Sequence, residues 1–415
     1  MTRRVFVTGM GVVSSLGLGR EAFWNALLEG RSGTSEIRSF DASKLGRSLA
    51  AEVQDFRPRD HLTEIEARRA GRCSAFAIAA ARMAVRDAGL RESSLRTERA
   101  SVVLGTTMGE ADVLGKLDAA WIHHGADAVS PRVVPKAAPY LVSMATARAL
   151  GCRGTVLTLP AACAAGNYAI GFASDLIRAG RADVVVTGAA EILQELQFAG
   201  FVRLGAVSPD RCLPFELDRR GLIVGEGSGV LVLESEEHAA RRNASVLAEV
   251  GGHGLACDGF HITRPEPSGA GVIHALREAI ARSGLVADDV DFVNAHGTAT
   301  KANDVVESTA VRAVFGERRV PVSSIKSMIG HCMGASSALE AVSCVESILS
   351  GMLPPTIGYE TPDPECDVAV VANHAVKSRA DVVVNHSLAF GGYDAVVLFA
   401  RQGRLPAPHS FGAQS

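Results

Sequence analysis

Short apolar runs alternate along the chain with longer segments in which apolar residues recur at every third or fourth position. The runs 100–105, 155–159 and 182–191 are typical of buried strands, whereas residues 164–179 have helical spacing. Strand-like and helix-like segments follow one another through most of the chain. This alternation predicts an α/β fold.

The order of these elements occurs twice. The same hexapeptide, Arg-Ala-Asp-Val-Val-Val, stands at 181–186 and at 379–384, and an apolar strand-like run follows each copy. We infer an internal duplication with a boundary near residue 245. The prediction is an N-terminal half, 1–245, a C-terminal half, 246–404, and a disordered tail, 405–415.

Composition narrows the function classes. The formal net charge is −3 and no basic stripe stands out, so we predict no nucleic-acid partner. The eight cysteines include no Cys-x-x-Cys pair, which fits neither a zinc site nor a disulfide framework. No apolar run reaches the length of a membrane span and no signal-peptide core follows Met1. We therefore predict a cytoplasmic protein that does not enter a membrane.

Cys163 is the first candidate for chemistry. It lies between the predicted strand 155–159 and the predicted helix, at a helix N-terminus whose dipole favours a thiolate over a thiol. Its neighbours, Ala161, Ala162, Ala164 and Ala165, leave room for a substrate carbonyl. By itself, this stretch would favour a buried structural cysteine over a nucleophile.

Two histidines occupy similar turns in the second half. His296 follows an apolar strand and precedes Thr298 and Thr300, which offer hydroxyls to a polar chain. His331 lies between glycines before a helix rich in small residues. The two histidines are far from Cys163 in the sequence, so only folding can bring the three residues together. Each histidine follows a predicted strand, and α/β folds bind ligands at the ends of their strands.

Three further residues complete the candidate site. Lys326 could orient a histidine or a carboxylate, and Glu340 could pair with it, although a structural ion pair would explain both. Phe390 stands before two glycines, which suits a gate or a backbone oxyanion donor as well as a simple tight turn. The adjacent His123 and His124 are interpreted as exposed surface, and we predict no metal site.

These motifs resemble those of β-ketoacyl-acyl carrier protein synthases of the thiolase superfamily, in particular the ketosynthase subunit of type II polyketide systems. The resemblance extends over nearly the whole chain and rests on four motifs: Ala162-Cys163-Ala-Ala-Gly, Asn294-Ala-His-Gly-Thr, Lys326-Ser-Met-Ile-Gly-His331 and Phe390-Gly-Gly. It implies a thiolase-like five-layered αβαβα fold with internal duplication.

The resemblance also implies residue roles. Cys163 would be the nucleophile, His296 and His331 the decarboxylation site, and Lys326 their support. The backbone amides of Cys163 and Phe390 would form the oxyanion hole, and Phe390 would gate the acyl pocket. Thr298 and Thr300 would contact phosphopantetheine, which arrives on the acyl carrier protein, so no cofactor is expected. Phe201 and Met108 are predicted to contact substrate, with Tyr140 and Leu388 as further pocket candidates.

The predicted reaction is the decarboxylative condensation of malonyl-acyl carrier protein with an acyl group on Cys163. Partners would be an acyl carrier protein and either a second copy or a chain-length factor. A self-sufficient fatty acid synthase of the same chemistry is the alternative. A thiolase would need a second late cysteine, which Leu388-Ala-Phe390 lacks, and a silent subunit would lack Cys163.

The chain departs from the family pattern in the gate segment. Many relatives carry Ser-Phe-Gly-Phe-Gly-Gly-Thr-Asn, whereas this chain has Ser387-Leu-Ala-Phe-Gly-Gly-Tyr-Asp394. Gly334-Ala-Ser-Ser and Lys301-Ala302 are also unusual. These differences predict altered gate movement and acyl specificity with the same chemistry.

Overall fold

The computed structural model describes residues 3–407, and its two halves share one continuous sheet. The strands of the N-terminal half run in the order β6 (Val156–Leu159), β5 (Ala100–Gly105), β7 (Val184–Glu191), β8 (Gly227–Ser235) and β1 (Val5–Ser14). The strands of the C-terminal half run in the order β13 (Ala369–Val370), β11 (Pro321–Ser323), β10 (Phe292–Asn294), β15 (Val382–Ala389), β16 (Tyr393–Ala400) and β9 (Ala248–Cys257).

Strand directions repeat between the halves. In the first half, β6, β5 and β7 are parallel, and β8 and β1 pair antiparallel. In the second half, β11, β10 and β15 are parallel, and β16 and β9 pair antiparallel. The repeated hexapeptides lead into β7 and β15, which are equivalent strands. The internal duplication predicted from the sequence is therefore confirmed.

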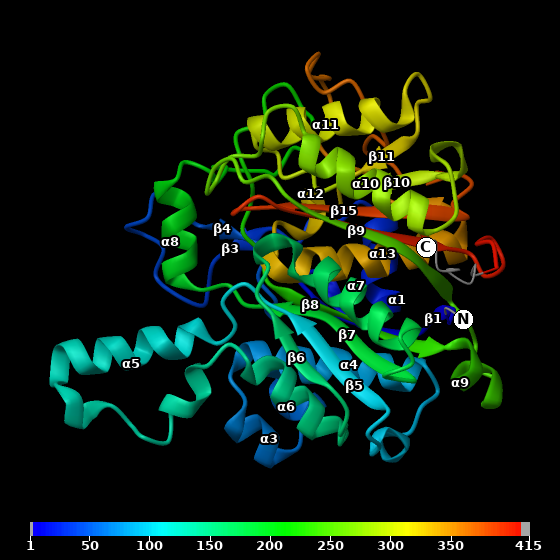
Figure 1. Cartoon of the computed structure of the whole chain (residues 1–415). Helices are drawn as coiled ribbons and strands as arrows, with labels where there is room; N and C mark the ends of the chain where they lie inside the picture. The colour runs from blue at the N-terminus through cyan, green and yellow to red at the C-terminus, as the bar shows by residue number, and fades with distance from the viewer. Residues whose placement is uncertain (1–2, 408–415) are drawn as a thin grey trace.

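Helices complete a layered arrangement, which Figure 1 shows edge-on. The helices α4 (Arg72–Asp87) and α6 (Leu141–Leu150) cover the outer face of the first half-sheet. The helices α10 (Ala270–Arg282) and α11 (Lys301–Phe315) lie on the outer side of the second half. Between the half-sheets, α7 (Ala165–Arg178) and α13 (Ser336–Ser350) contact strands of both. The predicted five-layered αβαβα fold is confirmed.

The remaining α-helices and strands connect the elements of these layers or pack against them. The other helices are α1 (Arg20–Leu28), α2 (Pro58–His61), α3 (Glu64–Arg69), α5 (Ala111–His124), α8 (Glu195–Arg203), α9 (Glu236–Arg241) and α12 (Lys326–Ile329). The other strands are β2 (Gly17–Leu18), β3 (Ser35–Glu36), β4 (Leu49–Ala50), β12 (Met352–Leu353) and β14 (Val376–Lys377). Within residues 3–407, no helix is both long and apolar enough to cross a membrane.

The spacing of apolar residues over 67–88 predicts one amphipathic helix, but the chain around residue 70 differs from this prediction. It forms α3 and α4, which are separated at Ala70 and Gly71. The buried carboxylate of Glu110 accepts hydrogen bonds from the amides of Cys73 (3.2 Å) and Ser74 (2.7 Å) and so caps α4. A Cβ atom at Gly71 would lie 2.1 Å from a Glu110 oxygen, so this capping requires glycine.

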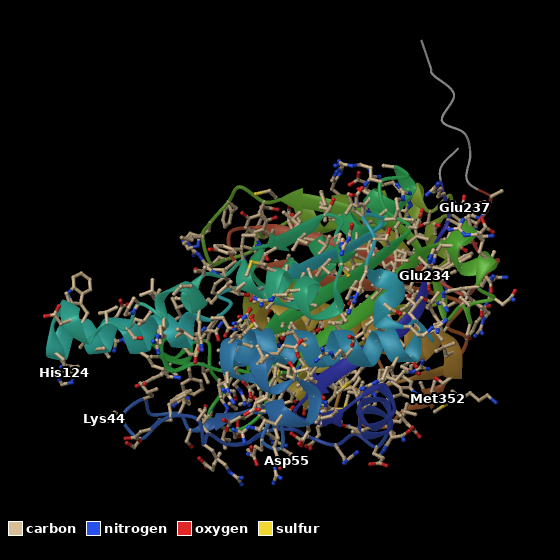
Figure 2. All side chains as sticks on the ribbon, turned by 90° about the horizontal axis from the view of Figure 1, so that it is seen from below. Lys44, Asp55, His124, Glu234, Glu237 and Met352 are labelled. Carbon is tan, nitrogen blue, oxygen red and sulfur yellow. The ribbon has the colours of Figure 1, made fainter. Side chains whose placement is uncertain are left out.

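Two other parts of the chain stand apart from the layers. The segment that contains α5 projects from the body, and His124 lies at its far tip (Figures 1 and 2). At the other end, Leu405 packs against the core of the C-terminal half. The rest of the predicted disordered tail, 408–415, lies outside the described residues.

The central helices approach closely at Gly166. A Cβ atom there would lie 2.7 Å from the backbone nitrogen of Ala338 on α13, which is closer than real side chains pack. We expect Gly166→Ala to lower the free energy of unfolding by about 1–3 kcal/mol, because the added methyl group forces the helices apart. Urea unfolding at fixed protein concentration measures the change.

Gly115→Ala is the matched control, because nothing lies within 4 Å of a Cβ atom at Gly115 on α5. Alanine favours a helix over glycine by up to about 1 kcal/mol, so this variant should equal or exceed the wild type in stability. Equal destabilisation by the two substitutions would contradict the close crossing.

Candidate active site

Residues from both halves line one cavity of about 570 Å³. Eight of the residues proposed from the sequence share it: Cys163, Phe201, His296, Thr298, Thr300, His331, Leu388 and Phe390. They come from segments that are distant in the sequence, which shows that the duplicated fold gathers them at one place. An enclosed space with few polar groups and several titratable side chains is the usual form of an active site.

Cys163 lies in the 3₁₀ turn Ala162–Ala164 between β6 and α7. The preceding residue, Ala162, has a left-handed backbone with φ of 45°. The turn from β11 into α13 contains the same feature, since Met333 has φ of 47°. The side chains of Cys163 and Met333 share one apolar cluster, so the two equivalent turns lie against each other.

The thiol of Cys163 is in a mixed electrostatic environment. Burial raises its pKa to about 12, while the charge of Lys326 and hydrogen bonds from the backbone amides of Phe390 and Cys163 itself act in the opposite direction. The sequence led us to expect that the helix N-terminus would favour the thiolate. In the structure, desolvation outweighs that effect because the side chain is enclosed.

The same two amides offer an oxyanion site. The N–H groups of Phe390 and Cys163 come from different halves of the fold, and both lower the pKa of the thiol, which indicates that they lie near the sulfur. Two converging backbone donors stabilise negative charge on a carbonyl oxygen without any rearrangement. This arrangement suits attack by the sulfur on a carbonyl carbon.

His331 has a defined tautomer. Its Nδ1 accepts from the backbone N–H of Met333 at 3.2 Å and lies 3.0 Å from the hydroxyl of Ser336. A backbone amide only donates, so Nδ1 carries no proton and the neutral ring is protonated at Nε2. Burial, with Lys326, holds its pKa well below the usual value, and so Nε2–H is a neutral hydrogen-bond donor.

His296 stands perpendicular to His331, with ring centroids 5.3 Å apart. Its backbone N–H donates to Glu307 at 2.6 Å, and that of Gly297 donates to the same carboxylate at 2.8 Å. The pKa of His296 is held well below its usual value, mainly by burial and then by Lys326 and the neighbouring histidines. Its Nδ1 has no hydrogen-bond partner among residues 3–407.

Lys326 and Glu340 form an ion pair that is completely inaccessible to solvent. The pair lies outside the cavity lining, so Lys326 acts on the site through its charge. That charge lowers the pKa of Cys163 and of both histidines. The support that Lys326 would give to the histidines during catalysis stays a prediction.

The aromatic rings of Phe201 and Phe390 stack with centroids 5.6 Å apart and planes at 26°. Phe201 belongs to α8, and Phe390 stands in the connection between β15 and β16. We call residues 390–392 the gate. Both stacked rings line the cavity, and the Phe390 amide lowers the pKa of Cys163.

The mouth of the cavity carries positive charge. The hydroxyls of Thr298 and Thr300 lie 2.9 Å apart and face the same space as four cationic side chains: Arg219, Arg220, Arg264 and Lys301. Arg219 is buried and pairs with Asp363 and Asp304. Phosphate and carboxylate groups are the ligands that such a mouth favours.

Some candidates from the sequence lie elsewhere. Met108 does not line this cavity, although its amide donates to the buried Glu191 at 3.3 Å. Tyr140 is exposed. His123 and His124 lie at the end of α5, and residues 3–407 hold no cluster of three or more potential ligands arranged for a metal ion.

Several residues that build the site escaped sequence reasoning. Glu307 holds the backbone beside His296, and Ser336 bonds to His331. Glu307 is a buried carboxylate on α11, eleven residues after His296, and nothing in a helical pattern marks it as an internal ligand. Only its position opposite a glycine turn could have suggested the contact.

Removing the charge of Glu340 tests the ion pair. We expect Glu340→Gln to lower the free energy of unfolding by about 3–5 kcal/mol, because it leaves the buried Lys326 ammonium without a counter-ion. Urea unfolding measures the loss. The control, Glu64→Gln, breaks the exposed pair with Arg68 and should cost less than about 1 kcal/mol. Similar small losses in both variants would contradict a charged buried pair.

Comparison with known proteins agrees with this site. The model of the β-ketoacyl synthase N-terminal domain matches residues 2–239, and that of the C-terminal domain matches residues 247–360. A 3-oxoacyl-[acyl-carrier-protein] synthase 2 from Synechocystis sp. is 38% identical over 96% of this chain and 98% of its own length.

Two solved structures are similar throughout. The ishigamide ketosynthase/chain length factor is 41% identical, with a TM-score of 0.93 over 97% of this chain and 100% of that chain. A type II polyketide synthase acyl carrier protein in complex with its ketosynthase bound to the hexaketide gives 31% identity and a TM-score of 0.89, with the same coverage of both chains. The sequence, the fold and the cavity lead to the same conclusion: this chain belongs to the β-ketoacyl synthase family of condensing acyltransferases.

Proposed function

We propose that the protein extends an acyl chain by two carbons, using malonyl-acyl carrier protein as donor, as the ketosynthase subunit of a type II polyketide system. The observation that carries this proposal is the convergence of Cys163, His296 and His331 on one cavity beneath two backbone amides. The similarity to an acyl carrier protein synthase and to a ketosynthase/chain length factor supports the carrier and the pathway.

In the first half-reaction, the sulfur of Cys163 attacks the thioester carbonyl of an acyl carrier protein. The amides of Cys163 and Phe390 hold the oxyanion, and the carrier thiolate leaves as the acyl-cysteine forms. The thiol proton passes to neutral His296 and then to the departing phosphopantetheine sulfur, so charge balances. Because burial disfavours the free thiolate, proton loss accompanies the attack instead of preceding it.

In the second half-reaction, malonyl-acyl carrier protein occupies the vacated cavity. The bond between its carboxylate and α-carbon breaks, carbon dioxide leaves, and the electron pair forms an enolate. His331 Nε2–H, together with His296, donates to the thioester oxygen on which this charge develops. The α-carbon then attacks the acyl-cysteine, the bond between the acyl carbon and the Cys163 sulfur breaks, and the expelled thiolate takes up a proton from solvent.

The cationic mouth supports a carrier-bound substrate. Thr298 and Thr300 are proposed to bond to the phosphopantetheine arm, and Phe201 and Phe390 to border the acyl chain. Glu340 would hold Lys326 in place behind the histidines. No resident cofactor is needed in this scheme, because the reacting groups are thioesters and side chains.

A second subunit is part of the proposal. The projecting segment exposes apolar side chains, among them Trp121 (61%) and Ile122 (76%), and β6 ends the sheet with Val156 exposed. Exposed apolar groups and an edge strand favour association with another chain. The similarity to the ishigamide ketosynthase/chain length factor favours a chain-length factor, and a second copy of this chain is the alternative.

Reconstitution tests this assignment. Purified protein is incubated with acyl and malonyl carrier proteins, alone and with a homologue that lacks the cysteine, and products are identified by intact-protein mass spectrometry. We expect a two-carbon extension only when the homologue is present. Extension by the protein alone would contradict the heterodimer and favour the self-sufficient fatty acid enzyme.

The histidine roles are separable from that of the nucleophile. We expect His331→Ala to slow carbon dioxide release from malonyl carrier protein by about 10²–10³-fold, because one donor to the enolate oxygen is lost. Acyl transfer to Cys163 should continue at a rate within about tenfold of the wild type, since Cys163 and both amides remain.

Release of labelled carbon dioxide and the mass of the acyl-enzyme provide the two readouts. His374→Ala, which alters an exposed histidine, is the control and should change neither rate. Loss of both activities in parallel, in a correctly folded His331→Ala protein, would contradict the division of roles.

A further inference from the structure

The backbone of the gate is hydrogen-bonded to the loop that follows β9. The N–H of Gly391 donates to the carbonyl oxygen of Ile262 at 2.8 Å, and the N–H of Asp258 donates to the carbonyl of Gly392 at 2.9 Å. Both partners belong to the loop that follows β9. A backbone movement of the gate relative to this loop therefore breaks these two hydrogen bonds.

Two carboxyl groups meet at the same junction. Asp394, the second residue of β16, is 2% exposed, and its side chain lies beside that of Asp258. A Cβ atom at Gly271 would lie 2.2 Å from Asp394 Oδ2 and 2.5 Å from Asp258 Oδ1, so both oxygens border one point on α10. The other oxygen of Asp258 accepts from the backbone N–H of Glu266 at 2.9 Å.

A hydrogen bond between two carboxyl groups needs a proton. Ionised carboxylates only accept, and Oδ2 of Asp394 receives no hydrogen bond from any donor in residues 3–407. If Asp394 is protonated, it donates to Asp258 and the buried oxygen is satisfied. If both groups are ionised, two negative charges repel each other in a solvent-excluded site.

The surroundings favour the protonated form. Burial contributes most, followed by the negative charges of Asp258 and Glu307, and together they raise the pKa of Asp394 to about 8. The other titratable groups facing this junction are Cys257 of β9, Tyr168 of α7 and Tyr393 of β16. None of these carries positive charge, so none offsets the repulsion.

We propose that the proton shared by Asp258 and Asp394 latches the gate over the acyl cavity, and that its loss releases the gate. Asp394 is then a positioning residue, because it acts through the gate and touches neither substrate nor sulfur. An asparagine at this position would donate at any pH, whereas an aspartate donates only when it is protonated. The inference rests on the proposed role of Phe390.

The sign of the pH effect follows from the raised pKa. Below it, the proton is present and the gate is held against Phe201. As the pH rises through about 8, the proton is lost, repulsion separates the loop from the gate, and the cavity opens. The latch therefore couples access of the acyl chain to pH in a range near neutrality.

Hydrogen exchange measures the latch without turnover. Protection of the Asp258 and Gly391 amides is compared between wild type and Asp394→Asn, each at the same pH so that chemical exchange rates cancel. We expect equal protection near about pH 6.5 and roughly tenfold faster exchange in the wild type near about pH 9, one unit above the pKa.

Asp367→Asn removes an exposed carboxylate that pairs with Arg319, and it should behave as wild type at both pH values. Asp258→Asn removes the other member of the pair and should show the same pH-independent protection as Asp394→Asn, which guards against misfolding of one variant. A constant ratio of wild type to both asparagine variants across the pH range would overturn the latch.

The outcome is independent of the proposed chemistry. If exchange follows the prediction but Cys163 never becomes acylated, the latch exists and the proposed function fails. If Cys163 is acylated while the exchange ratio stays flat, the function holds and the latch is wrong.

Discussion

The close crossing of α7 and α13 is the constraint on which the catalytic geometry depends. Each helix begins at a turn with a left-handed residue, and the absence of a side chain at Gly166 lets the two helix starts come together. Cys163 precedes one helix and His331 the other. The duplicated fold thus brings two equivalent strand ends into contact. One carries Cys163, the proposed nucleophile, and the other carries His331, the proposed donor to the enolate oxygen.

The electrostatics of the site have a common cause. Enclosure raises the pKa of Cys163 and lowers those of His296 and His331, so it favours the neutral form of all three groups; Lys326 acts in the same direction on the histidines and in the opposite direction on the thiol. In the proposed reaction, charge arises on substrate oxygens, to which the backbone amides and the imidazole N–H groups would donate. Donors fixed in a dry site stabilise such charge far better than water does. Burial of the Lys326 and Glu340 pair extends the same arrangement beyond the cavity.

The sequence predicted several strands of the fold and the main candidate residues of the site. The features that it did not predict depend on tertiary contacts. Apolar runs identified β5 and β7, and glycine-flanked histidines identified His296 and His331, because local pattern determines both. The break between α3 and α4 was missed, since it depends on Glu110 reaching back from a later segment. The raised pKa of Cys163 was missed for a related reason: a helix dipole is a local property, whereas desolvation depends on the whole fold. Asp394 was visible as a departure from the family pattern, but its partner Asp258 is defined only by tertiary contact.

Peptide mapping of the acyl-enzyme tests the central claim most directly. The protein is incubated with an acyl carrier protein substrate in the absence of malonyl donor, digested, and analysed by tandem mass spectrometry, with Cys163→Ala alongside. We expect the peptide that contains Cys163 to gain the mass of the acyl group, and we expect no acyl-enzyme in the variant. An acyl group on another residue, or undiminished acylation of Cys163→Ala, would contradict it.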